Sequence, residues 1–357
     1  MKNNKIKLTF AALLLLFFIT GKLVIGHYGH VFLDVNGGFL SILQVNSYYG
    51  DRGVFITDDK YIVSPANETS TDYEYNELIS FNEFLKENNV GLLYVNKPTK
   101  YNDDTFFYDN FGYDSYCNRN ADKFLKRIND AGIDYIDLRD NMRLENISCE
   151  DLFYRTDHHW TVKAGLWASN KIADKLNADY GYSIDTSLLD IENFSVNEWE
   201  NCWLGEQGAL LSESYVGLDD YTELKPNYDT SFIFEPDTKK SKTDTFDYFI
   251  NEDVYQSTGR GPSWHYSYRR YGTVNNKIES GNILLLCDSY DNVVAPFLAL
   301  GVHRVEPIVL RDCEEDFDLK KYILENDFDT VVISYAEFMI GAHDDESNAN
   351  YKMFTFE

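Results

Sequence analysis

Two segments of the chain carry the residue types of nucleophilic catalysis. Asp157 and His159 lie two positions apart in Tyr154–Thr161, directly before a predicted helix, and Ser289 follows an apolar run in Leu286–Asn292. A serine hydroxyl is a weak nucleophile that needs a histidine base, and the histidine needs an acid that fixes its tautomer and stabilises the imidazolium. These residues therefore predict a Ser289–His159–Asp157 triad, in the chain order Asp, His, Ser.

Each segment also has simpler interpretations. Ser289, or the Asp288 before it, fits the N-cap of a helix, and the histidines of an Asp-His-His loop are often satisfied by hydrogen bonds alone. Asp157, His158 and His159 also suit a divalent cation. Adjacent residues seldom all reach one ion, however, and the sequence shows no second carboxylate cluster at an obvious strand end. We therefore predict no metal site.

The chain around these segments alternates between helices and short apolar strands. Strands are expected at 54–56, 61–63, 90–95, 133–138, 283–286, 305–310 and 330–333, and helices at 74–88, 115–131, 161–176, 293–300 and 319–325. This alternation predicts an α/β fold whose mostly parallel sheet is covered on both faces. In such sheets reacting groups gather where strands end and helices begin, which is where Ser289 lies.

Two parts of the chain depart from this alternation. The stretch from about 180 to 282 is rich in Tyr, Asp, Ser and Asn, and we interpret it as a long insertion beside the active face. At the N-terminus three lysines precede the apolar run Leu8–Ile25, which is about long enough to span a bilayer. This pattern predicts a signal anchor over 1–26, kept rather than cleaved, and one extracytoplasmic domain over 27–357. Cleavage of the signal would make the protein secreted instead of single-pass.

The composition limits the classes of molecule that the protein is expected to bind. The chain has 357 residues with 32 Lys+Arg against 59 Asp+Glu, a formal net charge of −27, which disfavours a nucleic-acid partner because phosphates require a basic surface. The hydrophobic content of 44% excludes a wholly disordered chain. Acidic charge combined with 16% aromatic residues favours a neutral or basic glycan.

The two chemical segments together resemble a known family. The sequence from Arg155 to Thr161, followed by Gly165, resembles the signature of the DHHW protein family, which is related to the AlgX/AlgJ alginate O-acetylation proteins. The resemblance extends from about residue 49 to 335. Its further parts are Val54–Ile56 with Asp59–Ile62, Leu93–Lys100, Trp203–Gly205, Cys287–Tyr290 with Pro296–Leu298, and Ile308–Arg311.

The resemblance implies an SGNH-hydrolase-like three-layer sandwich. The family's Asp-x-His-Trp pattern falls on Asp157, His159 and Trp160, and its later serine falls on Ser289. The relatives are exported, act on polysaccharide and are associated with acetyl transfer. It also implies a membrane acyl-transporting O-acyltransferase partner, because an exported enzyme cannot draw on cytosolic acetyl-CoA.

These inferences combine into a hypothesis of serine-dependent acyl transfer. His159 takes the proton of Ser289, Ser289 becomes acetylated, and a sugar hydroxyl or water accepts the acetyl group without a cofactor. The Ser289 backbone N–H would stabilise the oxyanion, with Lys97 or Arg311 nearby; both also fit structural ion pairs.

Further residues are accessory or substrate-binding candidates. His158, Trp160 and Tyr290 are accessory candidates at the site. Trp203, Trp264 and Tyr266 are candidates for stacking on sugar rings, with core packing as the alternative.

Two other classes of function stay open. The chain is alternatively a non-catalytic glycan-binding or assembly component of a polysaccharide-modification system. The third hypothesis is a metal-dependent phosphoesterase that uses Asp157, His158 and His159.

Overall fold

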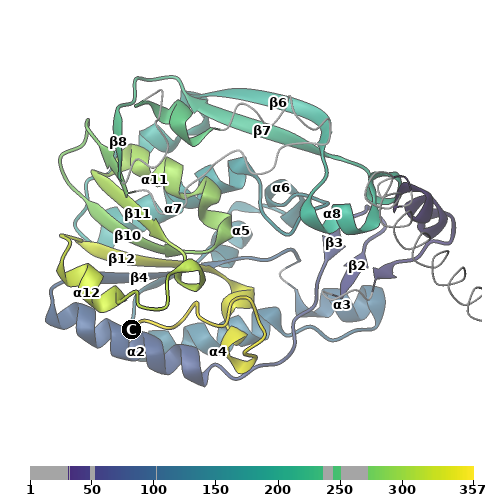
Figure 1. The fold of residues 1–357 in the computed structure, drawn as a ribbon, viewed down its shortest axis with the longest axis horizontal. Helices are drawn as coiled ribbons and strands as arrows, with labels where there is room; N and C mark the ends of the chain where they lie inside the picture. The colour runs from purple at the N-terminus through teal and green to yellow at the C-terminus, as the bar shows by residue number, and fades with distance from the viewer. Residues whose placement is uncertain (1–30, 32, 49–52, 102, 236–243, 251–271) are drawn as a thin grey trace, which may run out of the picture.

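A seven-stranded sheet forms the centre of the computed structural model, which describes residues 31, 33–48, 53–101, 103–235, 244–250 and 272–357 (Figure 1). Its strand order is β5-β4-β12-β10-β11-β9-β8, and the first five strands run parallel. The strands are β4 (Gly91–Lys97), β5 (Tyr135–Asp137), β8 (Phe232–Glu235), β9 (Gly272–Asn275), β10 (Asn282–Cys287), β11 (Arg304–Ile308) and β12 (Thr330–Ala336).

The central strands form because their sequences are apolar on both faces. Every residue of β12 is buried, and so is the Ile283–Cys287 run of β10. Leu285 of β10 pairs with Pro307 on one side and with Val332 on the other. A strand buried on both faces needs helices above and below it, so the predicted α/β fold with a mostly parallel sheet is confirmed.

Helices cover both faces of the sheet (Figure 1). One layer holds α2 (Asp72–Glu87), α4 (Cys117–Asp130) and α12 (Leu319–Leu324), and the other holds α5 (Leu138–Glu145), α7 (Val162–Asp179) and α11 (Ala295–Gly301). Helix α7 begins where Thr161 caps it, its hydroxyl accepting from the N–H of Ala164 at 3.2 Å. The predicted helices are found here, with ends shifted by a few residues.

The segment from about 180 to 282 contributes to this architecture in two ways. Strand β9 extends the main sheet antiparallel to β11, with Val274 opposite Arg304, and β8 adds antiparallel to β9, with Ile233 opposite Val274. Strands β6 (Phe194–Trp203) and β7 (Asp219–Pro226) form a separate antiparallel ribbon outside the α7–α11 layer (Figure 1). Along the chain, the short helices α8 (Glu206–Leu211) and α9 (Glu213–Val216) connect β6 to β7.

A smaller unit lies at one end of the molecule, beside α8 and α9 (Figure 1). It contains a helix over 33–42, the three-stranded sheet of β1 (Ser47–Tyr48), β2 (Val54–Ile56) and β3 (Ile62–Val63), and α3 (Asp104–Phe111). The predicted β-hairpin is confirmed, with Phe55 paired to Val63. Among the described helices, none has both the length and the apolar character needed to cross a bilayer. The predicted anchor, Leu8–Ile25, lies outside the described residues.

The topology brings five strand ends to one edge of the sheet. Because parallel strands point the same way, the residues that follow them meet at the carboxyl edge, where α/β folds bind ligands. The five residues that end or follow strands β4, β5, β10, β11 and β12 there are Lys97, Asp137, Asp288, Arg311 and Glu337.

Candidate active site

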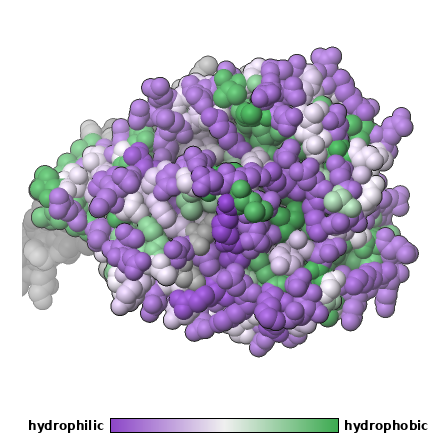
Figure 2. Space-filling view, turned by 180° about the vertical axis from the view of Figure 1, so that it is seen from behind, coloured by the Kyte–Doolittle hydropathy of each residue, from purple (hydrophilic) through white to green (hydrophobic). Residues whose placement is uncertain are grey.

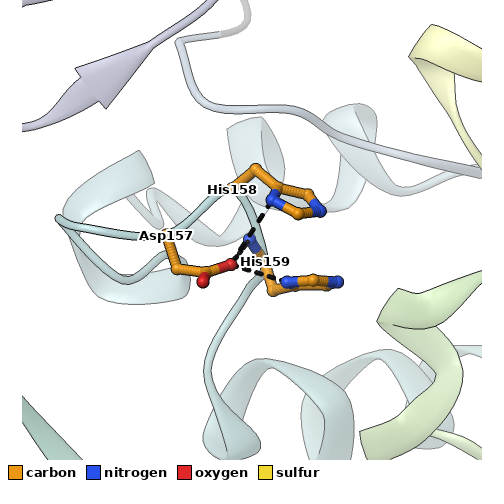
Figure 3. Close-up of side chains that lie close together, drawn as sticks. All are labelled: Asp157, His158 and His159. Carbon is orange, nitrogen blue, oxygen red and sulfur yellow. Dashed lines mark hydrogen bonds and ion pairs between the residues drawn. The ribbon is translucent and has the colours of Figure 1, made fainter. Parts of the chain in front are cut away.

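Ser289, His159 and Asp157 form one chain of hydrogen bonds. The His159 Nε2 atom lies 2.7 Å from the Ser289 hydroxyl oxygen, and its Nδ1 atom lies 2.6 Å from Asp157 Oδ1. Figure 3 shows Asp157 and His159 linked in this way, with the far nitrogen of the ring directed away from the carboxylate. The structure therefore brings the three residues singled out from the sequence together in the order that nucleophilic catalysis requires.

Asp157 is held as an acceptor on both of its oxygens. Oδ1 also accepts the backbone N–H of His159 at 2.9 Å, and Oδ2 accepts that of Glu206, the first residue of α8, at 2.6 Å. Burial opposes ionisation of this carboxyl, but the hydrogen bond from His159 and the charges of His159 and His158 hold its pKa well below the usual range. An ionised Asp157 favours the tautomer with the proton on Nδ1, which leaves Nε2 free to accept the serine proton.

The close approach of α8 to Asp157 depends on a glycine. A Cβ atom on Gly205 would lie 2.4 Å from the Asp157 Cβ and 2.6 Å from the Thr156 carbonyl oxygen. No other residue type fits there without a shift of backbone. Trp203–Gly205 therefore supports the site by allowing α8 to approach Asp157, and not by contributing a reacting group.

Ser289, the candidate nucleophile, lies on the turn after β10. Ser289 begins the 3-10 helix η4 (Ser289–Val293), and the Asp288 side chain caps it by accepting from the N–H of Tyr290 at 2.9 Å. Within the described residues, the backbone N–H of Ser289 has no hydrogen-bond acceptor. That N–H can therefore donate to a negatively charged oxygen at the Ser289 hydroxyl.

Lys97 lies beneath this turn and not in the cavity. Its ammonium group is fully buried and contacts Asp288 Oδ1 at 2.8 Å, a carboxylate oxygen of Asp291, and the carbonyl oxygen of Ser334 at 3.0 Å. Asp288 in turn accepts the N–H of Ala336 at 2.7 Å. Two roles were considered for Lys97. The structure places it in the ion pair, since its ammonium group lies beneath the turn and does not line the cavity.

Trp160 and Tyr290 connect the two chemical segments directly. The indole N–H of Trp160 donates to the Tyr290 carbonyl at 2.8 Å, and the Tyr290 hydroxyl donates to the His158 carbonyl at 2.5 Å. Both side chains are buried. These reciprocal hydrogen bonds fix the distance between the His159 and Ser289 backbones, so both accessory candidates position the reacting groups.

Asp219, at the start of β7, supports the same segment from the other side. Its carboxylate accepts the N–H of Arg155 at 3.0 Å, the N–H of Thr156 at 2.8 Å and the Thr156 hydroxyl at 2.6 Å. Asp219 could not be identified from the sequence, because nothing in the local pattern around it shows which distant backbone it will bind.

A cavity of about 590 Å³ opens beside the serine. Its polar lining includes Ser289, His158, His159, Arg311, Lys100 and Asn350, and apolar side chains from β3 and from residues 338–339 complete the wall. Arg311 donates to the Asn350 side chain at this wall. It is therefore the cationic candidate that does reach the cavity.

Lys100 was not singled out from the sequence. Its ammonium group donates to the carbonyls of Ile62 at 3.0 Å and Arg155 at 3.1 Å. Burial of this group lowers its pKa to about 7, against the opposing effect of nearby Asp157. Lys100 therefore joins the β2–β3 hairpin to the segment that carries Asp157.

Of the aromatic candidates for sugar stacking, the described Trp203 does not line the cavity. Trp203 is buried, with its ring centroid 4.1 Å from that of Tyr154, so core packing is its role. Trp264 and Tyr266 lie outside the described residues.

Asp157, His158 and His159 do gather their side chains on one side of the loop (Figure 3). One ligating atom from each lies within 4.8 Å of the others, which is closer than adjacent residues were expected to bring them. Both Asp157 oxygens already accept hydrogen bonds, however, from His159 and from Glu206. The arrangement therefore suits a proton relay better than a cation.

Glu337 lies directly behind the cavity wall. It follows β12, and its Oε2 accepts from the Thr99 hydroxyl at 3.0 Å and from the Cys117 thiol at 3.4 Å, both of which line the cavity. The Arg139 guanidinium lies 3.0 Å from the other oxygen. Burial raises the pKa of this carboxyl to about 7, with Arg139 opposing the shift.

Lys97→Met should destabilise the protein strongly. The variant leaves Asp288 and Asp291 buried without their cation, which typically costs about 3–5 kcal/mol of unfolding free energy. Lys123→Met is the matched control, because Lys123 pairs with Glu68 at the surface, where such pairs contribute roughly 0–1 kcal/mol. Denaturant unfolding of both variants measures the difference. Equal losses would contradict the role given to Lys97.

Glu337 should make stability depend on pH. Because its folded pKa of about 7 lies above the unfolded value, its contribution is complete below about pH 4.5 and is lost as the pH rises through 7, by up to about 3 kcal/mol. Glu337→Gln should therefore flatten the decline in unfolding free energy between these pH values. Parallel profiles for the two proteins would show that Glu337 does not titrate in this window.

Comparisons with known proteins agree with this architecture. Residues 50–249 match the model of the family described as SGNH hydrolase-like domain, acetyltransferase AlgX. No curated protein sequence matches the chain. Bacillus cereus PatB1, solved with a sulfonyl adduct, is 20% identical with a TM-score of 0.68 over 87% of this chain and 100% of that one. A DHHW family protein from Eubacterium siraeum is 15% identical, with a TM-score of 0.63 over 87% and 97%.

These matches confirm the resemblance drawn from the two sequence segments and the SGNH-hydrolase-like fold that it implied. The family model covers more than half of the chain and includes Asp157 and His159, although it ends before Ser289. The chain belongs to the family of SGNH hydrolase-like domains described by the acetyltransferase AlgX.

Proposed function

We propose that this protein is an exported serine-dependent acyltransferase or esterase that moves acetyl groups on a cell-surface or secreted polysaccharide. The observation that carries the proposal is the hydrogen bond of 2.7 Å between His159 Nε2 and the Ser289 hydroxyl, with Asp157 on the other ring nitrogen. Family membership supports the acetyl group as the group that is transferred.

The first half-reaction acylates the serine. His159 Nε2 takes the hydroxyl proton as Ser289 attacks the carbonyl carbon of an acetyl ester, and the ionised Asp157 stabilises the imidazolium. The negative charge on the tetrahedral intermediate faces the Ser289 backbone N–H. When the intermediate collapses, the bond to the donor oxygen breaks, and that oxygen takes the proton from His159.

The second half-reaction repeats these steps in reverse. A sugar hydroxyl enters the cavity, gives its proton to His159 and attacks the acetyl carbonyl. The bond to Ser289 then breaks, and the serine oxygen recovers the proton from His159. Water in place of the sugar gives an esterase, so access of water to the cavity decides between transfer and hydrolysis.

A polysaccharide acceptor fits the charge of the molecule. The net charge of −27 disfavours polyanions in general, whereas neutral hydroxyl groups encounter no such repulsion. The cavity of about 590 Å³ combines apolar walls with hydrogen-bonding groups, as sites for small polar molecules usually do.

Export and the acyl donor belong to the same proposal. The basic and apolar sequence of residues 1–26 supports a retained signal anchor, with the domain outside the cytoplasmic membrane. The acetyl donor must then cross the membrane, so we include a membrane acyl-transporting partner. In this proposal the acetyl donor and the acceptor bind in the same cavity one after the other, and both react at Ser289.

Ser289→Ala and His159→Gln should each lower the hydrolysis of a chromogenic acetate ester by about a thousandfold or more, since each removes a member of the relay. His158→Gln is the control. Its ring lies beside that of His159, but the hydrogen bond to Ser289 comes from His159, so the expected loss is less than about tenfold. A larger loss in His158→Gln than in His159→Gln would mean that His158, and not His159, is the base.

A sulfonyl fluoride should add covalently to Ser289, as measured by intact mass and peptide mapping. The related PatB1 was solved with a sulfonyl adduct, and an activated serine reacts with such reagents. Ser289→Ala should remain unmodified. An unreactive wild-type chain would favour the alternative of a glycan-binding or assembly component.

The metal-dependent phosphoesterase remains a distinct candidate because Asp157, His158 and His159 lie so close together. Loss of phosphoesterase activity on EDTA treatment, restored by a divalent ion, would support it. The proposed acyl transfer should be unchanged by EDTA.

A further inference from the structure

The helix over 33–42 has an apolar stripe that faces away from the protein. Val31, Val35, Phe39, Ile42 and Leu43 each expose between 45% and 78% of their surface. Spacings of three and four residues place these side chains on one face of a helix. In Figure 2 apolar atoms also gather at this end of the molecule. Contiguous exposed apolar side chains of this size indicate a surface that is normally covered.

The opposite face of the same helix is already used. Leu40 packs on the apolar cluster that includes Leu211 and Tyr215 of α8 and α9, and the Ser214 hydroxyl donates to the Asp34 carbonyl at 2.6 Å. A Cβ on Gly37 would lie 2.8 Å from the Leu211 carbonyl, so the helix sits as close as its backbone permits. The helix is therefore fixed on the domain, and its stripe cannot turn inward.

We propose that this apolar stripe inserts into the outer surface of a lipid bilayer. Five residues separate the apolar run Leu8–Ile25 from Val31, and a five-residue linker reaches at most about 18 Å. If the run lies in the bilayer, as proposed above, the helix lies within that reach of the headgroups. Helices bound in this way bury their apolar face about 5–10 Å into the boundary between headgroups and acyl chains.

The charges of this part of the chain indicate how the helix binds. Between residues 26 and 46 the sequence has one formally charged side chain, Asp34, and no Lys or Arg. Attraction to anionic lipid requires basic residues, so the binding depends on apolar insertion. We therefore expect the contact to be insensitive to salt and to the lipid headgroup charge.

A second copy of the chain fits this surface less well. Five apolar side chains on one helix face offer on the order of a few hundred Å², whereas a stable dimer buries about 800 Å² on each partner. In the sequence, the stripe is instead preceded closely by the run Leu8–Ile25, whose length and apolar character suit a bilayer. Lipid is therefore the occupant that the area and the chain continuity favour.

This placement brings the membrane close to the cavity. The helix over 33–42 rests on α8, whose first residues, Glu206 and Gln207, line the cavity, and Glu206 also holds Asp157. The lipid contact rests on the proposed membrane anchoring of Leu8–Ile25 and does not depend on the proposed chemistry at Ser289.

Photolabelling of the full chain tests the contact. We would reconstitute it in phosphatidylcholine vesicles that contain a phosphatidylcholine with a diazirine at the headgroup–acyl boundary, irradiate, and map the adducts by mass spectrometry. Adducts are expected at Phe39, Ile42 and Leu43 in addition to the run Leu8–Ile25. Adding phosphatidylglycerol or salt should leave the yield in 33–43 unchanged.

An exposed apolar residue outside the stripe serves as the internal control. Leu144 exposes 84% of its surface in α5 and should remain unlabelled, because it belongs to no stripe. Phe39→Ser combined with Ile42→Ser should lower labelling within 33–43 at least fivefold and leave labelling of Leu8–Ile25 unchanged. Reaction of Ser289 with the sulfonyl fluoride reports separately on the proposed function, which can therefore fail without affecting the lipid result.

Three outcomes would overturn the proposal. Adducts confined to Leu8–Ile25 would place the stripe in water or against protein. Labelling within 33–43 that requires anionic lipid would contradict apolar insertion. If no lipid adducts form within 33–43 and Phe39 instead cross-links two copies of the chain, the surface is a dimer interface.

Discussion

The buried ammonium group of Lys97 holds the turn on which the nucleophile depends. Ser289 must follow a strand directly and still present its hydroxyl to His159, so the backbone after β10 has to turn sharply at Asp288. Asp288 and Asp291 both point inward at this turn, and two buried carboxylates would repel each other without a cation between them. Lys97 reaches them from β4, two strands away in the sheet. The position of the serine is therefore set by an ion pair that never contacts a substrate.

The base is positioned by a different set of contacts, contributed mostly by remote parts of the chain. Asp219 holds the backbone at Arg155 and Thr156, while the first N–H of α8 holds Asp157. The segment over 180–282 is thus part of the support for the base, in addition to extending the sheet. Trp160 and Tyr290 then join this half of the site to the serine half. Each side chain of the candidate triad is therefore fixed from two directions, as a preorganised site would require.

Much of this could be predicted from the sequence, for identifiable reasons. Strands such as β10 are buried on both faces, so their sequences are apolar throughout and easily recognised. Ser289, His159 and Asp157 were identified because their chemistry is restrictive. Lys97 could not be assigned to one role, because a lysine at a strand end can point into a cavity or beneath it. Asp219, Lys100 and Glu337 were missed because their partners are distant in the chain. The joining of β8 and β9 to the main sheet was missed because the surrounding sequence is polar.

The position of β12 has a consequence for how the protein acquires its reactivity. It is the last strand of the described chain, yet it lies between β4 and β10 in the middle of the sheet. Strand β4 pairs with a segment more than two hundred residues later, with Val95 opposite Ser334, and contacts at such separations form late and slowly. Until β12 has joined the sheet, β4 and β10 are not held on either side of it, so Lys97 cannot reach Asp288 and Asp291. The turn that carries Ser289 is therefore fixed only after residues 330–336 have paired with both neighbouring strands.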